Sequence, residues 1–128
     1  MINNEKTEIT IKGKTHKISD IEIITVSDNF LMVYSNNDIL RYPSTSPISE
    51  LKQIGIEMYL KQINTFALWI GGNNIFNTSK ITSVSYEDNL IDVKVQTKNH
   101  AVTFDNFTGV EVMCLKQMSK RNNEELTK

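Results

Sequence analysis

The first third of the chain is a succession of short apolar segments separated by turn-forming residues, and this pattern constrains the fold most strongly. Residues 8–12 (EITIK) alternate apolar and polar side chains, as a half-buried strand requires. Residues 21–26 (IEIITV) are mostly β-branched and apolar, which favours a buried strand. Asp28-Asn29 and the later run 35–38 (SNND) supply turn chemistry. The pattern predicts a meander of antiparallel strands over residues 8–12, 15–18, 21–26, 30–34 and 39–42.

The middle of the chain changes to a helical pattern. Ser46 stands before Pro47, and this pair is typical of a helix start because serine caps free amide groups and proline fits the first helical position. Apolar residues follow at helical spacing, namely Ile48, Leu51 and Ile54. Gly55 is able to end this helix in a left-handed conformation. Residues 56–64 fit either a further helical turn or an irregular segment.

Strand signals return in the second half, at residues 66–70, 75–76, 81–86, 91–96 and 101–104, with hairpin tips at 87–89 and 98–100. Residues 107–118 fit a short C-terminal helix capped by Asn106. The final residues, 119–128 (SKRNNEELTK), are polar and predict a frayed tail. We find no internal repeat and no linker. The expected fold is therefore α+β and mostly β, with antiparallel strand meanders, a short central helix and a short C-terminal helix. It forms one domain over residues 1–118, followed by the tail.

Composition limits the class of protein. Fourteen basic residues against fifteen acidic ones give a net charge of −1, which excludes a globally basic nucleic-acid binder but leaves a local basic face open. The first eight residues (MINNEKTE) lack the apolar segment of a secretory signal. No apolar run is long enough to cross a membrane. Cys114, the single cysteine, has no internal disulfide partner and is expected to be buried. We therefore expect a cytoplasmic protein.

No group of residues points to catalysis or to a cofactor. His16 and His100 lack metal-ligand spacing and are expected to be exposed. The acidic residues Glu87, Asp88 and Asp92 fit a charged hairpin tip better than a cation site. Gly71-Gly72 is not followed by the Lys-Ser/Thr of a phosphate-binding loop. We predict no enzyme activity, no metal and no cofactor.

The order of these elements resembles the LytTR family of bacterial DNA-binding domains over residues 9–115. Residues 18–24 (ISDIEII) resemble the family's strand pair, and residues 30–34 (FLMVY) resemble the strand that follows. Residues 68–81 (LWIGGNNIFNTSKI) resemble a later segment that ends in two apolar residues, an asparagine and a downstream isoleucine. Residues 84–95 fit the hairpin after it. The resemblance implies a small transcription regulator that reads double-stranded DNA through the loops between its strands.

Under this resemblance, polar loop residues enter the DNA grooves. The implied base-edge contacts are Asn29, Asn73 and Asn74, and the implied phosphate contacts are Lys80 and Lys98. Further lysines that could add a basic patch are Lys12, Lys14 and Lys17. The chain departs from the family where members usually carry arginine and histidine, because Trp69, Gly71 and Gly72 stand there instead. Asp105 likewise replaces an arginine that contacts DNA.

These departures and the near-zero net charge leave a second hypothesis open. The chain is then a degenerate LytTR-like domain, or another β-rich module, that binds protein or dimerises without binding DNA. An exposed apolar strand edge, or the C-terminal helix that carries Met113 and Cys114, would form the contact.

Overall fold

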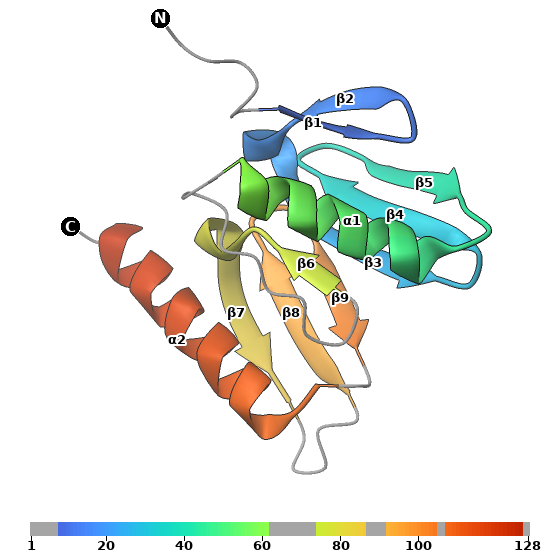
Figure 1. Ribbon diagram of the computed structural model, residues 1–128. Helices are drawn as coiled ribbons and strands as arrows, with labels where there is room; N and C mark the ends of the chain where they lie inside the picture. Colours follow the sequence, from blue (N-terminus) through green and yellow to red (C-terminus); the bar gives the residue numbers. More distant parts are fainter. Residues whose placement is uncertain (1–7, 62–73, 87–91, 105–106, 127–128) are drawn as a thin grey trace, which may run out of the picture. The chain divides into compact units, whose positions relative to one another are not determined.

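The computed structural model describes residues 8–61, 74–86, 92–104 and 107–126 (Figure 1). This part of the chain contains nine strands in three antiparallel sheets and two α-helices, so the predicted α+β class with a majority of strands is confirmed. The chain divides into two compact units, Met1–Asn77 and Thr78–Lys128, and each is described by itself. The predicted single domain over residues 1–118 stays a prediction. The predicted strand at residues 66–70 and the hairpin tip at 87–89 lie outside the described residues.

The first unit begins with a hairpin of β1 (Glu8–Ile11) and β2 (Lys14–Lys17). Lys12 and Gly13 form its two-residue turn with φ angles of 52° and 80°. Two successive positive φ angles are typical of the type I′ turn, whose twist matches that of the flanking strands. A short 3₁₀ turn at Ile18–Asp20 then leads into a four-stranded antiparallel sheet. This sheet has the order β5-β4-β3-β6, with β3 (Ile21–Ser27), β4 (Phe30–Ser35), β5 (Ile39–Pro43) and β6 (Asn74–Phe76).

The central helix, α1 (Pro47–Leu60), continues beyond the predicted end at Gly55. Gly55 is buried inside the helix, and Met58 packs into the core one turn after Ile54. Burial of Met58 contributes about 1.5–3 kcal/mol, which exceeds the cost of about 1 kcal/mol for an internal glycine. Ser46 occupies the position before the helix, as predicted, but its side chain makes no capping hydrogen bond.

The core of the first unit lies where α1 and the β1–β2 hairpin pack against the sheet. The inward-facing residues of β4, Leu31 and Val33, alternate with half-buried neighbours, as a sheet with one covered face requires. Packed together in this core are Ile9, Ile11, Ile18, Ile21, Ile24, Leu31, Val33, Leu51, Ile54, Met58 and Ile75.

The second unit is a three-stranded antiparallel sheet with one long helix. After a 3₁₀ turn at Thr78–Lys80 come β7 (Ile81–Ser85), β8 (Val93–Thr97), β9 (Ala101–Phe104) and α2 (Gly109–Leu126). The sheet order is β7-β8-β9. Val93, Val95 and Thr97 are buried while Lys94 and Gln96 are exposed, so β8 alternates fully between its two faces.

Thr108 caps α2, whereas the predicted cap, Asn106, lies outside the described residues. The Thr108 hydroxyl accepts a hydrogen bond from the Glu111 amide at 3.2 Å, and the Glu111 carboxylate accepts one from the Thr108 amide at 3.1 Å. This reciprocal pair is a capping box, which satisfies two amide groups that the helix itself leaves free.

Thr108→Ala is expected to lower the free energy of unfolding by about 0.5–2 kcal/mol, because it removes the acceptor of the Glu111 amide. Chemical denaturation measures this change. Ser46→Ala is the matched control, since Ser46 makes no side-chain cap, and its expected effect is smaller. Equal effects of the two substitutions would contradict the assignment.

The predicted frayed tail is wrong, because α2 continues through residues 119–126. Ser119 is buried and its hydroxyl donates to the Lys116 carbonyl at 2.8 Å. The Asn122 side chain donates to the carbonyls of Thr78 and Ile81, at 2.7 and 2.8 Å. These bonds hold the polar C-terminal end of α2 against the start of β7. This part of the sequence has no hydrophobic pattern that predicts them.

The two units repeat one arrangement of elements, although the sequence shows no internal repeat. Each unit contains a 3₁₀ turn, three antiparallel strands in a meander and a helix, in the same order. The register of β3 with β4 shifts between Ile21 and Ile23, and that of β7 with β8 shifts at the equivalent place, between Ile81 and Ser83. The turn after β4 and the turn after β8 are closed by equivalent backbone hydrogen bonds. Ser35 N–H donates to the Asp38 carbonyl and Thr97 N–H to the His100 carbonyl, both at 2.8 Å.

The repeat preserves burial and not residue identity. Equivalent buried pairs are Ile21 and Ile81, Ile24 and Val84, Leu31 and Val93, Val33 and Val95, Leu51 and Val112, Ile54 and Leu115, and Met58 and Ser119. Most of these pairs differ in residue type, because any apolar side chain of suitable volume maintains a packed core. A comparison of residue identities therefore does not detect the repeat.

Candidate functional site

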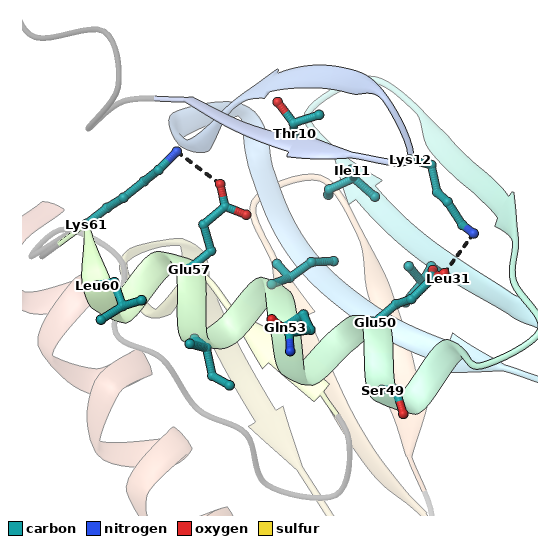
Figure 2. A pocket seen from close by; sticks show the side chains of 12 residues that line it. Thr10, Ile11, Lys12, Leu31, Ser49, Glu50, Gln53, Glu57, Leu60 and Lys61 are labelled. Carbon is teal, nitrogen blue, oxygen red and sulfur yellow. Dashed lines mark hydrogen bonds and ion pairs between the residues drawn. The ribbon is translucent and has the colours of Figure 1, made fainter.

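A hollow of about 720 Å³ lies in the first unit between β1 and α1 (Figure 2). Its lining includes three residues of the buried core, namely Ile11 of β1, Leu31 of β4 and Ile54 of α1. Ile56 and Leu60 of α1 also line it, and they are 49% and 72% exposed. The hollow is thus an open apolar groove whose wall on the α1 side carries large side chains in contact with water.

An ion pair closes each end of this groove. Lys12 Nζ lies 2.8 Å from Glu50 Oε1, and Lys61 Nζ lies 3.1 Å from Glu57 Oε1 (Figure 2). Glu50 and Glu57 are seven residues apart on α1, which corresponds to about 10 Å along the helix. The hydrogen bond from Lys12 holds the pKa of Glu50 below its usual value, so the carboxylate stays charged at neutral pH.

Several residues that line this groove were not identified as site residues from the sequence. The sequence left residues 56–64 open between a further helical turn and an irregular segment, so Ile56, Glu57, Leu60 and Lys61 were not identified as site residues. Met58 continues the helical spacing of Leu51 and Ile54, and this continuation was the signal that could have extended the helix over them.

Of the residues predicted to read base edges, Asn29 and Asn74 lie in the described part of the chain. Asn29 is exposed in the turn between β3 and β4, beside a second hollow of about 560 Å³ that Lys12 and Phe30 also line. Asn73 lies outside the described residues. Asn74 is only 2% exposed, and its side-chain oxygen accepts a hydrogen bond from the Thr25 hydroxyl. The assignment of Asn74 to a base edge is therefore corrected, because its amide serves to hold β6 on β3.

The two predicted phosphate contacts lie at the same end of the second unit's sheet. Lys80 directly precedes Ile81, Lys98 directly follows Thr97, and Ile81 is the register partner of Thr97. Lys98 is exposed, and Lys80 is half-buried. The structure brings together two lysines that are far apart in the sequence.

The lysines of the β1–β2 hairpin are only in part available to a ligand. Lys14 and Lys17 are exposed, whereas Lys12 forms the ion pair with Glu50. Cys114 is half-buried, and not fully buried as predicted.

His16 was expected to be exposed, but it is buried against Tyr42. His16 Nε2 and the Tyr42 hydroxyl share a hydrogen bond of 2.8 Å, and the two rings meet edge to face. Burial lowers the pKa of His16 from its ordinary value of 6.5, and the charge of Lys14 lowers it further. The same kind of desolvation raises the pKa of Tyr42, so this hydroxyl keeps its proton.

The lowered pKa of His16 makes stability depend on pH. The unfolded chain binds the His16 proton more readily, so the free energy of unfolding is highest above pH 6.5 and falls as the pH drops towards the lower pKa of the folded state. Urea denaturation at about pH 7.5 and 5.5 measures the fall, in the range where histidine titrates. His16→Gln is expected to reduce the difference and His100→Gln to leave it in place. An unchanged difference in His16→Gln would overturn this explanation.

Among the described residues, no group of three or more histidine, cysteine, aspartate or glutamate side chains is placed to hold a metal ion. Neither α1 nor α2, over the residues described, has the length and apolar character of a membrane-spanning helix.

Comparison of the chain with protein-family models, curated proteins and solved structures gives no match. Membership of the LytTR family therefore stays a prediction.

Proposed function

We propose that this protein is a protein-binding module that receives an apolar peptide segment in the groove between β1 and α1. The observation that carries the proposal is the exposure of Ile56 and Leu60 beside an apolar groove floor. Contact of these side chains with water costs about 25 cal/mol for each Å² of apolar surface, and a partner removes that cost. The near-zero net charge of the chain suits such a partner better than a polyanion.

The ion pairs define the partner further. Each end of the groove is polar and has a net charge close to zero, because it carries one ion pair, Lys12–Glu50 or Lys61–Glu57. Between them, about 10 Å accommodates roughly two helical turns or three extended residues. The expected partner therefore has a short apolar stretch with polar residues on either side.

A peptide library displayed on phage and selected on the full chain tests this proposal. Selected peptides are expected to share a short apolar core and to lose most of their binding to Leu60→Asp. Val110→Asp is the matched control, because Val110 is also an exposed apolar helical residue but lies on α2 and outside the groove. Failure to select an apolar core, or equal losses in the two variants, would refute the proposal.

DNA binding is the second candidate, and the observation in its favour is the shared position of Lys80 and Lys98 at one end of the β7–β8 pair. Two lysines at one end of a strand pair are able to contact two neighbouring DNA phosphates. Asn74 is buried and is not available to a base edge, whereas Asn29 is an exposed residue of the first unit. A regulator of LytTR type follows only if such binding exists.

Titration onto a pool of fluorescent duplexes at about 50 and 200 mM salt tests DNA binding, because contacts with phosphates release counterions and lose affinity as salt rises. Lys98→Ala is expected to weaken binding to all sequences alike and to lower the salt slope by about one. Lys52→Ala, which removes an exposed lysine of α1, is the control. Absence of binding at both salt concentrations would exclude this function.

A further inference from the structure

Another groove, of about 680 Å³, lies within the second unit between β7 and α2. Thr82, Ser83 and Val84 form its strand side. Its helix side includes Lys116 and Lys120, which are exposed, and Glu124 is its acidic residue. The groove therefore runs along a strand and carries a small excess of positive charge.

The equivalent place in the first unit is filled by a strand. There β6 pairs antiparallel with β3 through the register pairs Ile23 with Phe76, Ile24 with Ile75, and Thr25 with Asn74. Ile75 is fully buried in the core that α1 also enters. Under the repeat, Ile23, Ile24 and Thr25 correspond to Ser83, Val84 and Ser85 of β7. No other strand in the described part of the chain pairs with β7 except β8.

The hydrogen bonds at the start of the two edges support this equivalence. In the first unit, Asn77 donates from its side chain to the Ile21 carbonyl at 3.0 Å and from its backbone to the Glu22 carbonyl at 2.9 Å. In the second unit, the equivalent carbonyls are those of Ile81 and Thr82. They accept from Asn122 at 2.8 Å and from Asn123 at 3.2 Å. The asparagines of α2 thus take the place of the end of β6, and the next two residues of β7, Ser83 and Val84, line the groove.

We propose that the groove between β7 and α2 binds an extended segment of another protein, which adds as a strand to residues 83–85. An exposed strand edge is a template for such pairing, and main-chain hydrogen bonds provide the affinity. By analogy with Ile75 opposite Ile24, the residue opposite Val84 is apolar. Acidic residues beside it complement Lys116 and Lys120. The site is separate from the groove between β1 and α1, and the experiment that tests it does not depend on the proposed function.

A second copy of this chain is a poorer occupant. Antiparallel pairing of β7 with β7 of another copy would bring the Lys116 and Lys120 side chains of both copies to the same seam, where like charges repel. An acidic partner gains from the same two lysines. The charge of the groove therefore favours a different protein.

The test uses a synthetic peptide, Glu-Glu-Asn-Ile-Phe-Asn-Glu, whose centre copies the sequence of β6, with blocked ends. Addition of this peptide to the isotope-labelled full chain is expected to shift the amide resonances of Ser83, Val84 and Ser85. A peptide with lysine in place of each glutamate is expected to bind more weakly, and one with proline in place of isoleucine is expected not to bind, because proline cannot pair in a strand.

Two variants of the protein locate the site. Lys120→Glu is expected to weaken binding of the acidic peptide about fivefold or more. Lys94→Glu makes the same charge change at an exposed position of β8 outside the groove, and is expected to leave binding close to that of the unchanged chain. The proposal is overturned if the residues of β7 do not respond to the peptide, if the two variants weaken binding equally, or if these resonances shift with protein concentration alone, which would indicate a second copy as the occupant.

Discussion

Replacement of Phe76 by alanine is expected to lower the free energy of unfolding by about 3–5 kcal/mol. Phe76 is 0% exposed and pairs with Ile23 across the β6–β3 ladder. The substitution removes a large buried ring and leaves a cavity that the sheet is unable to close fully, since β6 is also held by the bond between Thr25 and Asn74. Denaturation in urea measures the change.

Phe30→Ala is the control for Phe76→Ala. Phe30 is a half-buried phenylalanine of the same sheet, and the Arg41 guanidinium lies 4.4 Å from the centre of its ring. Loss of this partly exposed ring is expected to cost about 1 kcal/mol, which includes a weak cation–π contact. If the two substitutions destabilise the protein equally, the burial of Phe76 is wrongly assigned.

Leu51→Ala is expected to lower the free energy of unfolding by about 2–5 kcal/mol. Leu51 is 0% exposed and belongs to the core where α1 packs on the sheet. The substitution replaces a side chain in full contact by a cavity, while the helix itself tolerates alanine well. Thermal or chemical denaturation checks the result.

Leu60→Ala makes the same chemical change in the same helix, at a residue that is 72% exposed. The expected change in stability is within about 0.5 kcal/mol. Peptide binding in the groove between β1 and α1, in contrast, is expected to weaken. A destabilised Leu60→Ala protein would mean that Leu60 is covered by the folded chain, and the proposed groove would lose its main contact.

The strand meander could be predicted closely from the sequence because its signals are local. Alternation in residues 8–12 and the β-branched run at 21–26 correspond to β1 and β3, with ends that differ by one residue. The pair Asp28-Asn29 marks the turn between β3 and β4, where Asp28 has a left-handed φ angle of 53°. Each of these features depends on residues that are neighbours in the chain.

The candidate sites could be predicted only in part because they depend on distant neighbours. Lys80 and Lys98 were identified as candidate phosphate contacts, but only the register of β7 with β8 places them at one end of a sheet. Asn74 has the same local character as an asparagine in a turn, and only its position opposite Thr25 makes it a buried support. The groove between β7 and α2 depends on a helix end that hydrophobic periodicity does not reveal.

The amino-acid sequence by itself determined the α+β class, the antiparallel meander and the start of the central helix, since backbone preference and apolar periodicity act over a few residues. Tertiary structure alone decided that α1 continues through Gly55, that α2 continues through Ser119, that His16 is buried and that two units repeat one arrangement. In each of these cases the deciding energy comes from burial or hydrogen bonds between segments that are distant in sequence. Such contacts exist only once the chain has folded.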